Sequence, residues 1–389
     1  MSEEISGSVV EGFEKVRQVF ADNFSKGGDV GASVAVVQDG EYLVDLWGGW
    51  AGTRPWQADT IVNVWSTTKG FVSLCAHILI DRGQLELDKP VADYWPEFAQ
   101  AGKAKITVRQ LLSHRAGLMA WDEPIPPEDM FNWEKLCSML AATEPFWEPD
   151  TASGYHARTF GHLVGKLVQC VDGRPISRFL HEEVAEPLNA DIFVGVPSEL
   201  EHRIADLCEI PGSQWDAPDT DNKFSNNSGF ELTERMIKAF SVPEISLSIV
   251  NSSEWRSGVF PSSNGHASAR GIATIYGTIA SGGTYGDVRL FSPAATERMR
   301  EAQPTARDIV IGAVAGETTW GMGFMLNNPA GYGPNPRAFH HGGIGGSLGF
   351  CDPEANFGFG YAMCAMGSPL EDRRAARLLF SVYECMRNK

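Results

Sequence analysis

A serine and a lysine three residues apart stand just ahead of a long apolar stretch. Ser66 and Lys69 occur in "NVWSTTKG", and "FVSLCAHILI" follows. If a helix begins here, residues i and i+3 share one face. A serine hydroxyl attacks a carbonyl carbon when a base takes its proton, and a lysine whose pKa is lowered by burial can be that base. The spacing predicts a nucleophile beside its base, although Ser66 could also be an ordinary helix cap and Lys69 a surface residue.

The elements around this pair are strand-rich at both ends of the chain and helical between them. "GASVAVVQDGEYLVDLWGGWA" predicts two strands around an Asp39-Gly40 turn, and "GSLGFCDPEANFGFGYAMCAM" predicts two more late in the chain. Apolar residues at helical spacing predict an opening helix that includes Val9 to Phe20, helices over much of 70–173 and a last helix over 372–387. Residues from about 209 to 230, rich in Ser, Asn, Asp, Pro and Gly, predict a long loop.

This order predicts an α+β fold built from both chain ends. We expect residues 1–70 and 285–389 to form an antiparallel sheet flanked by the terminal helices. Residues 71–284 would then form a mainly helical inserted domain. A cleft between the two parts is the expected position of the active site.

Composition narrows the class of protein. The 32 basic and 49 acidic residues give a net charge of −17, which disfavours binding to nucleic acid or to anionic lipid. The seven cysteines include no Cys-x-x-Cys pair, and no Cys/His spacing fits a zinc site, so we expect reduced thiols and no metal. The first residues do not resemble a signal peptide and no apolar stretch is long enough to span a membrane, so we expect a cytoplasmic protein. The oligomeric state stays open.

Two further motifs follow the serine and lysine in order. They are Tyr155-His156-Ala157, in "SGYHART", and His341-Gly342-Gly343, in "FHHGGIGG". With "TVRQLLSHRAGL" and "NGHASARGIATIYGTIASGG" they make the chain, from about residue 10 to 385, resemble the class C β-lactamase-like superfamily of Ser-x-x-Lys enzymes. The resemblance is nearest to the family VIII carboxylesterases, and it implies a β-lactamase/transpeptidase-like fold and hydrolysis of short-chain esters.

The resemblance also implies a mechanism of two-step acyl transfer. Ser66 would be the nucleophile, with Lys69 and Tyr155 together taking its proton. The backbone N–H groups of Ser66 and Ile344 would form the oxyanion hole. No metal or organic cofactor is expected. Tyr155 could alternatively pack a loop at the edge of a helix.

Two departures from the lactamase-like pattern bear on the substrate. Ala157 replaces an asparagine that can bind the amide side chain of a β-lactam, and His341 replaces a lysine that lends positive charge near a substrate carboxylate. Both replacements favour a small, neutral ester. A β-lactamase or D-amino-acid peptidase, an acyltransferase, and a binding protein without activity stay open as alternatives.

The remaining candidate substrate-binding residues adjoin the motifs. Gly342 and Gly343 would let a substrate approach bare backbone, and His341 would orient the substrate or hold a strand. Trp65, beside the serine, and Trp320, in "TWGMGF", could line an apolar acyl pocket.

A second serine also matches a nucleophile motif. Ser347 lies in Gly-x-Ser-x-Gly, the pattern of the α/β-hydrolase nucleophile elbow. That motif requires a strand, a turn and then a helix. Here the expected context is a strand that turns back into another strand, so we do not expect Ser347 to be the nucleophile.

Overall fold

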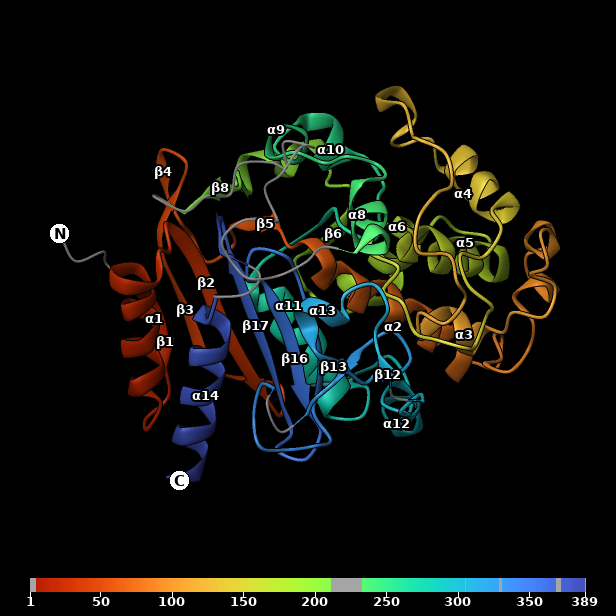
Figure 1. Ribbon diagram of the computed structural model, residues 1–389. Helices are drawn as coiled ribbons and strands as arrows, with labels where there is room; N and C mark the ends of the chain where they lie inside the picture. Colours follow the sequence, from red (N-terminus) through yellow and green to blue (C-terminus); the bar gives the residue numbers. More distant parts are fainter. Residues whose placement is uncertain (1–4, 211–232, 305, 329–330, 369–371, 389) are drawn as a thin grey trace.

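The computed structural model describes residues 5–210, 233–304, 306–328, 331–368 and 372–388. The predicted loop over about 209–230 lies almost wholly outside these ranges. A large antiparallel sheet occupies one side of the molecule (Figure 1). Its strands run in the order β1 (Ile5–Val9), β3 (Glu41–Ala51), β2 (Gly31–Gln38), β17 (Phe357–Met363), β16 (Leu348–Asp352), β15 (Phe339–Gly342) and β14 (Met325–Leu326), and β4 (Arg54–Pro55) pairs with β3.

The centre of the sheet joins the two ends of the sequence. Strand β2 pairs antiparallel with β17 along its whole length, from Gln38 opposite Phe357 to Ala32 opposite Met363. Both strands are buried almost throughout, which is why "ASVAVV" and "FGFGYAM" are continuous apolar runs. The two predicted strand pairs, around Asp39-Gly40 and after Ser347, are therefore confirmed.

Helices cover both faces of this sheet. The helix α11 (Ala269–Ala280) packs on β17, β2 and β16, and α1 (Glu14–Gly27) packs with α14 (Arg374–Arg387). Figure 1 shows α14 in front of the sheet and α11 behind it. The approach of α11 depends on glycine: a Cβ on Gly358 would lie 1.9 Å from the backbone nitrogen of Gly277.

The first helix begins later than the sequence predicts, so the predicted start at Val9 is wrong. Residues Ile5–Val9 form the edge strand β1, which pairs with Val44 to Gly48 of β3, and the helix begins only at Glu14. Pairing with β3 provides partners for the backbone groups of this segment, and this tertiary contact overrides its apparent helical period.

The middle of the chain is mostly helical. Its central helix, α2 (Thr68–Asp81), is buried from Thr68 to Leu79, which explains the apolar run after Lys69. Helix α5 (Phe160–Asp172) packs on α2. The other helices are α3 (Val108–Leu112), α4 (Trp133–Ala142), α6 (Ile176–Leu180), α7 (Glu186–Leu188), α8 (Glu234–Ser241), α9 (Leu247–Val250), α10 (Ser253–Ser257), α12 (Pro293–Met299) and α13 (Gly312–Ala315).

Small sheets accompany these helices. One has the order β6 (Ile192–Val194), β9 (Gly265–Ala267), β5 (Ile61–Asn63) and β7 (Ile204–Ala205). Two-stranded pairs are formed by β8 (Cys208–Glu209) with β18 (Ala365–Met366), β10 (Thr284–Tyr285) with β11 (Val288–Arg289), and β12 (Ala306–Arg307) with β13 (Glu317–Thr318). The range 71–284, predicted to be mainly helical, thus also contributes strands, and its α11 covers the main sheet. The division into two domains at residues 70 and 284 stays a prediction.

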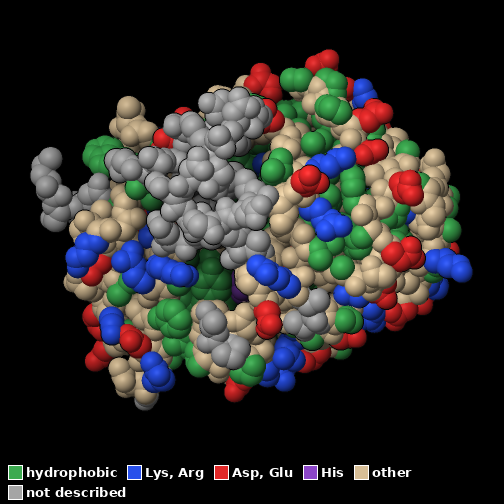
Figure 2. All heavy atoms as spheres, viewed as in Figure 1, with side chains coloured by type: hydrophobic (Ala, Val, Ile, Leu, Met, Phe, Trp, Pro, Cys, Tyr) green, Lys and Arg blue, Asp and Glu red, His purple; other side chains and the backbone are tan. Residues whose placement is uncertain are grey.

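The surface carries mixed charge. Figure 2 shows acidic and basic side chains next to one another over α1 and α14, where Lys15 forms an ion pair with Glu384. All seven cysteines are free thiols. Within the described ranges, no helix is long and apolar enough to cross a membrane.

Candidate active site

The candidate nucleophile Ser66 lies in a short 3₁₀ turn, Trp65–Thr67, which leads directly into α2. Trp65 has a φ of +47°, a left-handed conformation that is unusual for a bulky residue. The backbone N–H of Val64 donates to the carbonyl of Gly265 at 2.8 Å, and the Thr68 hydroxyl donates to the carbonyl of Trp65. These contacts hold the turn, and Ser66 is the only member of the turn that is partly exposed.

Lys69 is the buried partner of this serine. Its Nζ lies 3.0 Å from Oγ of Ser66 and donates to the carbonyl of Ser262 at 2.9 Å. The side chain is fully buried, and burial, with a smaller effect from the charge of Arg158, holds the pKa of Lys69 well below its usual range. A neutral amine at this distance can accept the proton of the serine hydroxyl.

Tyr155 is the third residue at this point. Its hydroxyl is hydrogen-bonded to Ser66, and Nζ of Lys69 lies 4.9 Å from the centre of its ring. Burial raises the pKa of Tyr155, while the bond to Ser66 and the charge of Arg158 act in the opposite direction. The structure therefore brings together the three residues that the sequence predicts to be catalytic.

Asp308 fixes Tyr155 and Trp320, and sequence reasoning missed it. Its Oδ1 accepts the backbone N–H of Tyr155 at 3.1 Å, and its Oδ2 accepts Nε1 of Trp320 at 3.0 Å. The N–H groups of Val310 and Ile311 donate to the same Oδ1. The rings of Tyr155 and Trp320 stack with centres 5.6 Å apart and planes 7° apart. No motif marks Asp308, because its partners come from separate segments.

His341 lies on β15, with its ring 6.2 Å from the ring of Tyr155. Its Nδ1 is 3.0 Å from the carbonyl of Gly342, and its Nε2 is buried and has no hydrogen-bond partner among the residues that the structure describes. Burial and, next, the charge of Lys69 hold the pKa of His341 well below its usual range. The imidazole is thus neutral near pH 7, so it does not replace the positive charge of a lysine.

The loop after β15 closely approaches the turn Trp65–Thr67, called the nucleophile turn below. A Cβ on Gly343 would lie 2.3 Å from the carbonyl oxygen of Val64, two residues before Ser66. Gly343 is thus required where two backbones meet. Among the described residues, the backbone N–H groups of Ser66 and Ile344 donate to no side chain or loop carbonyl. Both remain available to a substrate oxygen.

Ser347 holds this loop in place. Its hydroxyl donates to the carbonyl of Val64 at 2.8 Å and lies 3.1 Å from the hydroxyl of Thr67. The side chain is buried, and strands β16 and β17 follow it with no helix between them. The serine of the Gly-x-Ser-x-Gly match is therefore a structural residue.

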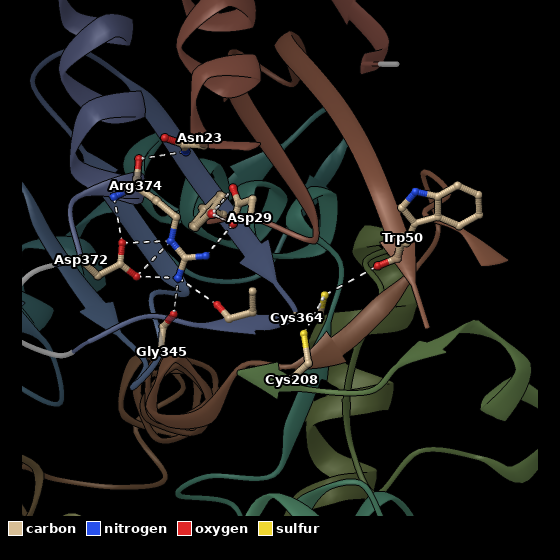
Figure 3. A network of polar contacts seen from close by, with 10 residues as sticks. Asn23, Asp29, Trp50, Cys208, Gly345, Cys364, Asp372 and Arg374 are labelled. Atoms are coloured by element: carbon tan, nitrogen blue, oxygen red, sulfur yellow. Dashed lines mark hydrogen bonds and ion pairs between the residues drawn. The ribbon is translucent and has the colours of Figure 1, made fainter. Parts of the chain in front are cut away.

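A buried charge network holds the far side of the same loop (Figure 3). Nη2 of Arg374 donates to the carbonyl of Gly345 at 2.8 Å, directly after Ile344. Arg374 is 1% exposed and pairs with Asp29 and with Asp372, each at 2.6 Å. The loop that carries Ile344 is thus anchored to the start of α14.

Metal binding has no candidate site in the part of the chain that the structure describes. No group of three or more His, Cys, Asp or Glu residues there could hold a metal ion.

The fold and the Ser–Lys–Tyr arrangement are those of serine acyl-transfer enzymes with a β-lactamase/transpeptidase-like fold. The family model described as Beta-lactamase matches residues 16–384, and the chain belongs to this family.

Three similar proteins carry names that mention esters or penicillin. Esterase/beta-lactamase LipL of Mycobacterium tuberculosis is 31% identical over 386 residues, covering 94% of this chain and 84% of LipL. The crystal structure of a family VIII carboxylesterase is 40% identical with a TM-score of 0.90, covering 98% of this chain and 100% of that one. A penicillin-binding protein homolog from Caulobacter crescentus is 38% identical with a TM-score of 0.88, covering 98% of this chain and 100% of the homolog. The predicted fold is confirmed.

Proposed function

We propose that this chain is a serine ester hydrolase that cleaves small carboxylic esters through an acyl-enzyme on Ser66. The observation that carries the proposal is the fully buried Lys69, whose pKa is lowered and whose Nζ lies 3.0 Å from the serine oxygen. The similarity to a family VIII carboxylesterase and to LipL supports the choice of esters.

The proposed reaction has two steps. Lys69, with Tyr155, takes the proton of Ser66 as its oxygen attacks the ester carbonyl. The negative oxygen of the tetrahedral intermediate is stabilised by the N–H groups of Ser66 and Ile344. The C–O bond to the alcohol breaks and Tyr155 returns the proton to the leaving oxygen. Water, deprotonated by the same pair, then attacks the acyl carbon. The bond from this carbon to Oγ of Ser66 breaks, the pair returns the proton to Oγ, and the acid leaves.

The alternatives use the same site. A β-lactamase or D-amino-acid peptidase would need recognition of an amide and a carboxylate, and the uncharged Ala157 and His341 disfavour it at the positions where that recognition is usual. An acyltransferase would differ only in replacing water by another alcohol or amine.

The test compares two serines on two substrate classes. We expect Ser66→Ala to lower kcat on 4-nitrophenyl butyrate by at least about 10³-fold. Ser347→Ala should keep kcat within about tenfold of wild type, because that serine only anchors a loop. A chromogenic cephalosporin should turn over far more slowly than the ester. Full activity of Ser66→Ala would overturn the assignment, and faster cephalosporin turnover would favour the lactamase alternative.

Two broader expectations accompany this function. We propose that residues 1–70 and 285–389 form one domain and 71–284 the other, because Ser66 and Ile344 come from the first range and Tyr155 from the second. A cytoplasmic location is supported by the seven free thiols.

A further inference from the structure

Arg158 is a buried cation without an acidic partner in the described part of the chain. It is 9% exposed, and it forms no ion pair with any carboxylate among the described residues. Within the described ranges its Nε has no hydrogen-bond partner, and its other nitrogens make only long contacts, 3.3 Å to Oγ of Ser263 and 3.4 Å to the carbonyl of Phe240. Buried arginines are rare unless they are paired, because removing the charge from water is costly.

Three contacts place this guanidinium beside the catalytic residues. Its Cζ lies 5.6 Å from the ring of Trp65, the neighbour of Ser66. Ser263, its hydroxyl contact, directly follows Ser262, whose carbonyl accepts Lys69. Phe240, its carbonyl contact, has its ring 6.2 Å from the ring of Tyr155.

Arg158 is charged at neutral pH and has no carboxylate partner among the described residues. Burial lowers the pKa of Arg158 to about 10, so the guanidinium stays charged at neutral pH. Burial lowers the pKa of both Lys69 and His341 and so disfavours their charged forms. The carboxylate of Asp308 already accepts four N–H groups, from Tyr155, Val310, Ile311 and Trp320. A substrate carboxylate would supply the counter-charge that the described residues lack.

We propose that Arg158 binds a carboxylate of the substrate, so that the preferred esters carry a free carboxylate in addition to the ester bond. The planar guanidinium offers unpartnered or weakly bonded N–H groups that match two carboxylate oxygens. The inference rests on the proposed ester hydrolysis and changes one expectation: Ala157 and His341 alone predict a neutral ester, whereas Arg158 points to an anionic one.

The test uses esters that differ only in charge. The first pair is 4-nitrophenyl hydrogen glutarate and its methyl ester, with the charge on the acyl side. The second pair is 4-acetoxybenzoate and its methyl ester, with the charge on the leaving group. We expect wild type to prefer the anionic member of at least one pair by about tenfold to a hundredfold in kcat/KM. The pair that shows the preference tells which side of the substrate carries the carboxylate.

Substitution of Arg158 tests whether the preference for the anionic ester depends on this side chain. Arg158→Gln should reduce the anionic-to-neutral ratio to near one, chiefly by raising KM for the anionic ester, and Arg158→Lys should restore part of it. The readout is a ratio, so changes common to both esters cancel. Arg289→Gln removes the same charge from an exposed position and should leave the ratio unchanged. A ratio near one in wild type for both pairs, or an unchanged ratio in Arg158→Gln, would overturn the proposal.

A binding measurement separates this proposal from the proposed function. Calorimetric titration of Ser66→Ala protein with monomethyl glutarate needs no hydrolysis. Binding that is at least about tenfold weaker in Ser66→Ala/Arg158→Gln supports the carboxylate site even if no ester is cleaved. Equal binding by both proteins contradicts the site even if ester hydrolysis is established.

Discussion

A single methyl group at Gly343 tests whether the β15 loop must touch the nucleophile turn. In Gly343→Ala the new Cβ would lie 2.3 Å from the carbonyl oxygen of Val64 and 2.3 Å from Oγ of Ser347. Such atoms are rarely closer than about 3.2 Å, so the two backbones must separate by close to 1 Å. The Val64 carbonyl cannot simply rotate away, because it also accepts the hydroxyl of Ser347.

The expected loss is large in catalysis and moderate in stability. A displacement of about 1 Å between the N–H groups of Ser66 and Ile344 should lower kcat about 10²-fold. Overpacking should cost about 1–3 kcal/mol of unfolding free energy. Hydrolysis of 4-nitrophenyl butyrate and urea denaturation measure the two effects.

The neighbouring glycine provides a matched control. In Gly342→Ala the nearest atoms to the new Cβ are the Ser347 carbonyl oxygen at 3.6 Å and a Leu348 methyl at 3.8 Å, both ordinary contacts. This variant should keep the free energy of unfolding within about 0.5 kcal/mol of wild type. The reasoning is refuted if Gly343→Ala retains kcat within threefold of wild type, or if both alanines destabilise the fold equally.

Two further predictions concern buried charge. The value of kcat/KM on a neutral ester should fall as the pH falls through the pKa of Lys69, because the protonated amine cannot accept a proton. The inflection should lie well below the ordinary lysine value of 10.5, since burial disfavours the charged form. A pH–rate profile with its inflection near 10.5 would contradict this. Arg374→Met should destabilise the fold by roughly 3–5 kcal/mol in urea denaturation, because it leaves the carboxylates of Asp29 and Asp372 without their cation. The exposed pair of Lys26 with Asp22 is the control, and Lys26→Met should cost at most about 1 kcal/mol; equal losses would show that burial of the network is immaterial.

The local part of the candidate site could be predicted from sequence. Ser66 and Lys69 are adjacent because helix geometry brings residues i and i+3 to one face. The apolar run after Lys69 indicates that this helix is buried. Tyr155 and the loop after His341 follow from the order of the motifs. The strands at the centre of the sheet have apolar runs or turn signals that mark them directly.

The non-local part could not be predicted. Arg158 directly follows the Tyr155-His156-Ala157 motif, but its lack of a carboxylate partner among the described residues appears only when the fold brings Ser263 and Phe240 beside it. The left-handed conformation of Trp65 opposes the preference of bulky residues, so no propensity suggests it. The apolar spacing of the first residues predicts a helix, but Ile5–Val9 forms the strand β1 because its backbone hydrogen-bonds to β3, a contact that local spacing does not reveal.

The pairing of β2 with β17 has a consequence for the synthesis of the protein. The nucleophile turn leaves the ribosome about 280 residues before the loop with Ile344, which at roughly 5–20 residues per second is a delay on the order of tens of seconds. During that interval one edge of β2 has no partner from its own chain, and an unpaired apolar edge can recruit a strand from another molecule. The nascent chain therefore carries its serine and lysine without the N–H group of Ile344, and the proposed hydrolysis requires the late strands to close the sheet first.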